Sequence, residues 1–225
     1  MRKALSLALA LCLALSVTAC GGKSGDNVSF SDSAEQSTTA EMQAQRVEPL
    51  LSTKIDMENL ADGNYAVSFS TDDIINDGEL QELRFTVYNC DLYDTVEVAQ
   101  LTAGDTLVVN GEDIAVESVE QTDYGISVNG GLENGGVDLS PGEGGTYYLS
   151  LMDNNKDYQP VGEITLPFAE DFIFTDDSDQ SNPGQTFNVD ELSSMEGDTQ
   201  GFIAANTTLT MVGGYIAAIE RMFMP

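Results

Sequence analysis

Apolar and polar residues alternate over short stretches through most of the chain after Gly63. These stretches are rich in Val, Ile, Thr, Tyr and Phe, and Gly, Asn and Asp separate them at close intervals. Alternation with a period of two, bounded by turn-forming residues, is typical of half-buried β-strands. The pattern predicts strands at 65–70, 83–88, 95–101, 106–109, 114–119, 125–128, 146–151, 163–166, 172–175, 207–212 and 215–223.

One hairpin can be predicted in register. If Asn110-Gly111 forms a two-residue turn, Val109 lies opposite Glu112 and Leu107 lies opposite Ile114. The apolar residues of both arms then share one face, as a single buried side requires.

The spacing of the strands indicates an all-β fold, either an antiparallel sandwich or a partly open barrel. Two small β-subdomains joined near 139–145 are the alternative arrangement. The segment 207–223 would also suit a helix near its end, but Gly213-Gly214 in its middle favours a turn between two strands.

The chain before the strands has a different composition. Between Gly21 and about Gln45 it consists mainly of Ser, Thr, Gly, Ala, Gln and acidic residues, which cannot bury enough apolar surface to become ordered. A flexible coil of about 24 residues has an r.m.s. reach of roughly 27 Å. We therefore expect 20–54 to be a flexible linker with a candidate short helix at 40–48, and 55–225 to form the β-rich domain.

The N-terminus has the layout of a secretory signal. Arg2 and Lys3 precede an apolar stretch at 4–17, and small residues follow up to Ala19. The apolar stretch is about fourteen residues long, whereas a membrane span needs roughly twenty. Residues 1–19 are therefore expected to direct export and then to be removed.

The end of this segment, Val17-Thr18-Ala19-Cys20-Gly21, resembles the lipobox of bacterial lipoproteins. The resemblance covers residues 1–21 and implies cleavage before Cys20, whose thiol then carries a diacylglyceryl group. Stable attachment takes two or more acyl chains, such as palmitate, because one chain binds a membrane only marginally. We expect a lipid-anchored protein at the cell surface, on the extracytoplasmic face of a bacterial membrane.

The charge of the chain excludes one class of partner. The sequence contains 8 basic and 38 acidic residues, which gives a net charge of −30. Such a surface repels phosphate backbones, so no nucleic-acid partner is expected. The acidic residues are interpreted as a solvated surface that keeps the domain soluble, and the alternative is that some of them bind divalent cations.

The few cysteines and the absence of histidine exclude several kinds of catalytic and metal site. Of the three cysteines, Cys12 would leave with the signal and Cys20 would be lipidated, so Cys90 is the remaining thiol and no disulfide can form within the mature chain. The sequence has no histidine, which excludes Ser-His-Asp and Cys-His catalysis and the common zinc ligand sets. Cys90 has acidic neighbours in sequence, and we interpret it as a buried small residue rather than a nucleophile.

One loop has the spacing of a metal site. Asp153, Asn155 and Asp157 place oxygen-bearing side chains at alternate positions, as calcium loops require. Tyr158 stands where an EF-hand has its glycine, and Ile164 stands where it has its closing glutamate. These departures favour a polar turn between strands, so no cofactor is expected, and a calcium site is the alternative interpretation. The acidic segment 176–179 is interpreted as a solvated loop.

These observations favour a non-catalytic surface module that binds an extracellular ligand or an envelope protein. The alternative is a carboxylate-based or calcium-dependent hydrolase of envelope or dietary polymers. A structural part of an envelope complex is a third hypothesis, which predicts an exposed apolar patch.

Overall fold

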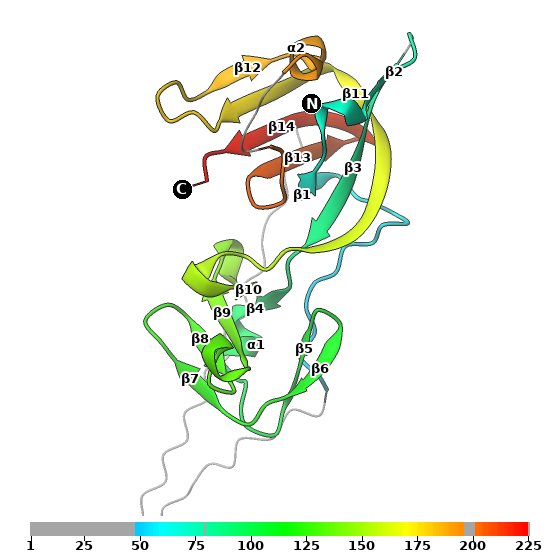
Figure 1. The fold of residues 1–225 in the computed structure, drawn as a ribbon. Helices are drawn as coiled ribbons and strands as arrows, with labels where there is room; N and C mark the ends of the chain where they lie inside the picture. Colours follow the sequence, from blue (N-terminus) through cyan, green and yellow to red (C-terminus); the bar gives the residue numbers. More distant parts are fainter. Residues whose placement is uncertain (1–47, 79, 196–200, 225) are drawn as a thin grey trace, which may run out of the picture. The chain divides into compact units, whose positions relative to one another are not determined.

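The structure is a computed structural model that describes residues 48–78, 80–195 and 201–224 (Figure 1). Its described part is mainly β-structure, which confirms the all-β prediction. The strands form a seven-stranded sheet, a five-stranded sheet and a two-stranded sheet. The lipobox and nearly all of the expected linker and short helix lie outside the described residues.

The largest sheet contains strands from both ends of the described chain. Its members are β1 (Gly63–Ser68), β2 (Ile74–Asn76), β3 (Gln81–Asn89), β11 (Gln159–Asp177), β12 (Gln185–Phe187), β13 (Thr207–Val212) and β14 (Tyr215–Met222). Their order is β12-β11-β14-β13-β1-β3-β2, and β11 also pairs with β3. Pairing therefore runs from β11 through β14, β13, β1 and β3 back to β11, so these strands close into a barrel.

The long strand β11 makes this closure possible. Its first half, from Gln159 to Pro167, pairs antiparallel with β3, and its second half pairs parallel with β14. The register shifts between Phe168 and Ile173, as expected where a β-bulge bends a strand. One strand can thus belong to both sides of the barrel.

Apolar side chains from alternate strand positions fill the barrel. Phe85, Phe174, Leu209 and Ile216 are among the residues with at most 1% exposure. Each such side chain contributes about 1.5–3 kcal/mol to folding when it is fully buried. The helix α2 (Val189–Ser193) adds buried apolar residues to the same cluster.

A second set of elements surrounds a separate hydrophobic cluster. Its members are β4 (Leu92–Asp94), α1 (Thr95–Val98), β5 (Thr106–Val109), β6 (Glu112–Ala115), β7 (Val119–Gln121), β8 (Ile126–Val128), β9 (Val137–Pro141) and β10 (Thr146–Ser150). The five-stranded sheet has the order β4-β10-β9-β8-β7, and β5 pairs with β6. Single-turn 3-10 helices are η1 (Thr71–Asp73), η2 (Leu132–Asn134), η3 (Glu143–Gly145) and η4 (Met152–Asn154).

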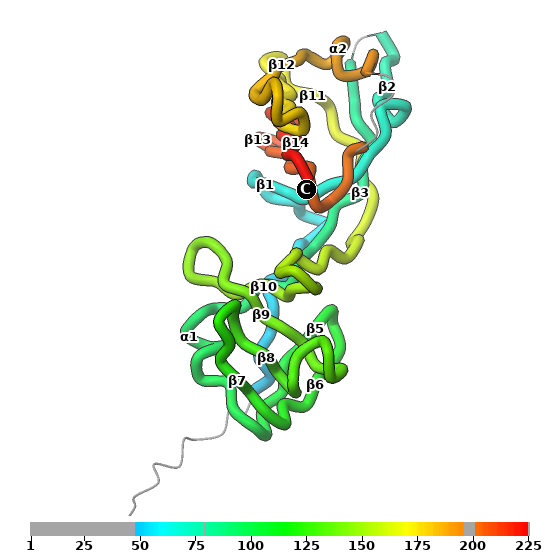
Figure 2. Tube along the Cα trace, turned by 60° about the vertical axis from the view of Figure 1, so that its left-hand side comes forward, coloured from blue at the N-terminus to red at the C-terminus, as the bar shows by residue number. Residues whose placement is uncertain are grey.

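Successive segments of the chain contribute to the two clusters in turn, as the colours along the trace in Figure 2 show. Leu50 belongs to the second cluster, β1 to β3 belong to the barrel, β4 to β10 return to the second cluster, and β11 resumes the barrel. The predicted joint at 139–145 is therefore wrong, because β9 pairs with both β8 and β10 inside one sheet.

Leu50 also changes the expected start of the folded region. The sequence pattern predicts that Leu50 belongs to the linker 20–54, but its side chain is only 1% exposed. Its amide donates to the carbonyl of Thr106 at 2.8 Å, and its carbonyl accepts from the amide of Val108 at 2.9 Å. Leu50 thus continues the sheet beside β5, and folded structure begins before residue 55.

Local predictions were the most accurate. The β5–β6 hairpin has the predicted register, with Leu107 opposite Ile114 and Val109 opposite Glu112. The C-terminal segment forms the β13–β14 hairpin, whose turn is Gly213-Gly214.

Four strand predictions need correction. The segment 95–101 begins as helix α1, because the Asp94 side chain accepts hydrogen bonds from the amides of Val96 and Glu97 and so caps a helix. The segment 114–119 is divided between β6 and β7. The segments 163–166 and 172–175 are parts of the single strand β11.

Candidate functional site

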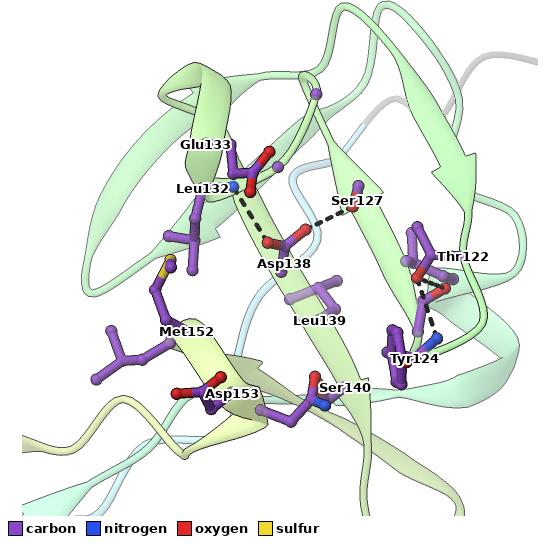
Figure 3. A pocket seen from close by; sticks show the side chains of 16 residues that line it. Thr122, Tyr124, Ser127, Leu132, Glu133, Asp138, Leu139, Ser140, Met152 and Asp153 are labelled. Carbon is purple, nitrogen blue, oxygen red and sulfur yellow. Dashed lines mark hydrogen bonds between the residues drawn. The ribbon is translucent and has the colours of Figure 1, made fainter.

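The outer face of the five-stranded sheet carries a row of polar residues. On β8 and β9, Ile126, Val128 and Leu139 are buried in the hydrophobic cluster. Because side chains alternate between the two faces of a strand, Ser127 and Asp138 point to the opposite face. Their side chains meet, and Ser127 Oγ donates to Asp138 Oδ1 at 2.5 Å (Figure 3).

Two single-turn helices border this polar row. The amide of Leu132, at the start of η2, donates to Asp138 Oδ2 at 3.1 Å. On the other side, Ser140 Oγ lies within hydrogen-bond distance of Asn154 Oδ1 of η4, at 3.1 Å, and of Ser150 Oγ, at 3.0 Å. The sheet thus fixes both borders through hydrogen bonds from its outer face.

Together these elements enclose a groove with a volume of about 750 Å³. Its floor is formed by β8 and β9, and its walls are the turn before β8, η2 and η4. Tyr124 and Met152 stand on the walls with 71% and 67% of their surface exposed. The volume lies within the range of about 300–1,000 Å³ that is typical of ligand sites.

A glycine allows η2 to approach the floor. A Cβ atom at Gly131 would lie 2.5 Å from Asp138 Oδ1, and the residue has a φ angle of +71°. Both the close approach and the left-handed backbone conformation favour glycine. Gly131 therefore permits the contact between η2 and Asp138 that shapes the groove.

The charged residues that line the groove are acidic. Among the residues that the structure describes, its lining includes Glu133, Asp138 and Asp153 but no lysine or arginine. Residues 91–157 as a whole carry fourteen acidic residues and one basic residue, Lys156. Lys156 does not line the groove, and its Nζ lies 5.6 Å from the centre of the Tyr148 ring.

No family model matches the chain, and neither the curated proteins nor the solved structures include a significant match. Within residues 48–78, 80–195 and 201–224, no helix combines the length and the apolar character that crossing a membrane requires.

The loop that the sequence suggested for calcium forms a tight reversal after β10. The amide of Leu151 donates to the carbonyl of Asn155 at 2.6 Å, and Lys156 bridges back to Ser150. Asp153 has a φ angle of +63°, a left-handed conformation that aspartate tolerates better than most residues. This geometry is the polar turn that the sequence favours over a calcium loop.

The three candidate ligands have separate surroundings. Asp157 accepts from Asn110 Nδ2 at 3.0 Å and from Gln159 Nε2 at 2.8 Å, whereas Asp153 lines the groove. The side-chain amide of Asn155 donates to the carbonyl of Met152 at 3.5 Å. In the part of the chain that the structure describes, no three His, Cys, Asp or Glu residues gather as metal ligands.

The acidic segment 176–179 differs from the expected solvated loop at its first residue. Asp176 is only 6% exposed and forms an ion pair with Arg221, which is 3% exposed. Asp177 and Asp179 accept hydrogen bonds from the amides of Gly184 and Ser181. These contacts stabilise the barrel and the turn after β11, so the segment has a structural role.

The thiol of Cys90 is partly buried and donates to the carbonyl of Leu149 at 3.5 Å. Burial raises its pKa to about 11, so the reactive thiolate is scarce at neutral pH. This agrees with the sequence interpretation of a packed residue rather than a nucleophile.

Sequence reasoning missed most of the groove. Asp153 was singled out, but for metal chemistry, and Ser127, Asp138 and Met152 were not singled out at all. A usable signal was present, because Ile126-Ser127-Val128 and Val137-Asp138-Leu139 alternate as half-buried strands do. That alternation predicts a polar outer face, but not the helical turns that convert it into a groove.

Proposed function

We propose that this protein is a lipid-anchored, non-catalytic binding module on the extracytoplasmic face of a bacterial membrane, and that the groove on the five-stranded sheet holds its ligand. The observation that carries the proposal is the exposure of Tyr124 and Met152 above a hydrogen-bonded polar floor. Ligand sites commonly combine apolar walls with a few fixed polar groups. The lipobox at Val17–Gly21 supports the anchor.

The contacts of Asp138 favour a structural role over hydrolysis. Its carboxylate accepts hydrogen bonds from Ser127 Oγ and from the amide of Leu132, so it holds η2 against the floor of the groove. The hydrolase hypothesis therefore has no specific support from Asp138.

The anchor can be tested by labelling growing bacteria with radioactive palmitate. Wild-type protein is expected to incorporate label and to fractionate with membranes, whereas Cys20→Ser should do neither. Cys12→Ser is the matched control, because Cys12 lies in the segment to be removed, and it should behave as wild type. Labelling of the Cys20→Ser protein would contradict the anchor.

The groove can be tested in intact cells with a photo-crosslinking amino acid introduced at Met152. A matched control is Val96, which is 64% exposed on α1 and does not line the groove. We expect a discrete adduct from position 152 and none from position 96. Equal adducts at both positions, or none at either, would refute the groove as the ligand site.

A further inference from the structure

We infer that the ligand of the groove is a basic peptide segment, in which at least two lysine or arginine side chains flank apolar ones. This inference rests on the proposed function and specifies the chemistry of the partner. Three features carry it, namely the charge of the lining, the exposed apolar side chains, and the separation of the acidic residues along the groove.

Charge complementarity selects a cation. Glu133, Asp138 and Asp153 line the groove, and no basic side chain of the described residues lines it to neutralise them. An anionic ligand would be repelled both here and by the surrounding residues 91–157, which contain only Lys156 as a base. A cavity lined by one sign of charge concentrates the field and attracts ligands of the opposite sign.

The exposed apolar residues on the walls favour a ligand that carries apolar groups as well as positive charge. Leu151, Met152 and Tyr124 are 46%, 67% and 71% exposed. Methionine adapts its shape to varied apolar partners, and the face of a tyrosine ring attracts cations as well as apolar groups. A simple inorganic cation would leave these surfaces in water, so a ligand with apolar groups fits better.

The positions of the carboxylates favour a peptide over a single amine. Figure 3 shows Glu133 and Asp153 toward opposite ends of the groove, with Asp138 between them. One ammonium group cannot contact both ends. An extended peptide places alternate side chains about 6.6 Å apart on one face, so it can present cations to both ends and apolar residues between them.

The test uses the full lipidated chain in detergent micelles and three fluorescent peptides of equal length. The first alternates lysine and leucine, and in the other two every lysine is replaced by serine or by glutamate. Fluorescence anisotropy is expected to detect binding of the lysine peptide alone. Binding should weaken strongly between about 20 mM and about 500 mM salt, as screening of exposed charges requires.

A charge-matched pair of variants localises the effect. Glu133→Gln with Asp153→Asn removes two carboxylates from the groove, and asparagine tolerates the left-handed backbone at position 153. Glu112→Gln with Glu117→Gln removes the same charge from exposed positions outside the groove. We expect the groove variant to bind about two- to fivefold more weakly per carboxylate removed and the control to bind as wild type.

Equal weakening in both variants would overturn the inference, because it would assign the effect to net charge. Equal binding of the serine peptide would also overturn it, as would binding of butylammonium with the same affinity as the lysine peptide. These failures are distinguishable from failure of the proposed function. If the adduct at position 152 forms while the lysine peptide does not bind, the groove is a ligand site but its ligand is not basic.

Discussion

The ion pair between Asp176 and Arg221 provides a strong test of how the barrel is stabilised. The two residues are partners in the parallel register of β11 and β14, and their side chains are 8% and 3% exposed. Arg221 Nε donates to Asp176 Oδ1 at 3.1 Å, and its guanidinium carbon lies 4.7 Å from the centre of the Phe202 ring. Removing the carboxylate would take this ion pair away from a buried guanidinium.

Breaking such a pair from one side typically costs about 3–5 kcal/mol, whereas replacing both partners with apolar residues is often neutral or stabilising. We therefore expect Asp176→Leu to lower the free energy of unfolding by about 3–5 kcal/mol. Asp176→Leu combined with Arg221→Met should be more stable than the single variant. Urea unfolding followed by far-UV circular dichroism, on a soluble form that begins after Cys20, measures both changes.

An exposed ion pair provides the control. Arg84 and Asp73 pair with side-chain exposures of 51% and 24%, and Asp73→Asn is expected to cost at most about 1 kcal/mol. If Asp176→Leu costs no more than Asp73→Asn, burial does not determine the strength of the pair. If the double variant is the least stable of the set, the pair itself provides net stabilisation and the argument is refuted.

The same pair predicts a dependence of stability on pH. Burial raises the pKa of Asp176, but hydrogen bonds from Arg221 and Ser178 outweigh it, so the pKa lies below its ordinary value of 3.8. A carboxyl group with a lowered folded-state pKa stabilises the fold above its unfolded-state pKa, and this contribution is lost as the pH falls through the folded-state pKa. Stability should fall more below about pH 3.8 in wild type than in the double variant.

Two further predictions concern the second hydrophobic cluster and the free thiol. Gly136→Ala would place a Cβ 2.0 Å from the Val128 carbonyl oxygen and should lower the free energy of unfolding by about 3 kcal/mol or more. A Cβ at Gly135 meets nothing within 4 Å. Gly135→Ala should therefore cost only the strain of its left-handed backbone, about 1–2 kcal/mol. Equal urea midpoints for the two variants would contradict this steric argument. With a pKa of about 11, the thiolate of Cys90 is about one part in ten thousand at pH 7, so iodoacetamide should react slowly with folded protein and much faster in urea. Mass spectrometry measures the rate, and equal rates in both states would show that burial does not protect the thiol.

The parts of the fold that the sequence predicted depend on neighbouring residues. The β5–β6 hairpin follows from the turn residues Asn110-Gly111 and from apolar residues at matching positions on both arms. The β13–β14 hairpin follows in the same way from its two glycines. In each case the turn residues and the strand pattern lie within a few residues of each other, so the hairpin can be predicted without any long-range contact. The register was predicted for β5–β6 alone, and that of β13–β14 shifts between Thr210 and Met211.

Closure of the barrel could not be predicted in this way. Gln159 of β11 pairs with Asn89 of β3, and Asp176 of the same strand pairs with Arg221 of β14. The segments 163–166 and 172–175 look like separate strands, because Pro167 and the acidic residues Glu170 and Asp171 interrupt the apolar pattern. A bulge accommodates this interruption and bends the strand, and only the tertiary structure reveals that both halves belong to one strand.

The groove illustrates a different limit. The sequence drew attention to Asp153 because acidic residues with alternate spacing suggest metal binding, but a turn uses the same residues for their backbone conformation and local hydrogen bonds. What distinguishes the two functions is the direction of the side chains, and Asp153 and Asp157 have different surroundings. In the sequence, nothing marked Asp138 as a groove residue except its alternation with apolar neighbours, although its carboxylate holds η2 in place.

The construction of the groove separates the residues that shape it from those that would select a ligand. Ser127, Asp138 and Ser140 are fixed by the sheet and by hydrogen bonds, so substitutions there disturb the walls themselves. Glu133 and Met152 are exposed on single-turn helices at the borders. Substitutions of exposed side chains that remove no buried contact usually change stability by less than about 0.5 kcal/mol. Ligand preference can therefore change at the borders while the sheet that supports them stays folded, which is the arrangement expected when binding residues lie on loops held by a rigid scaffold.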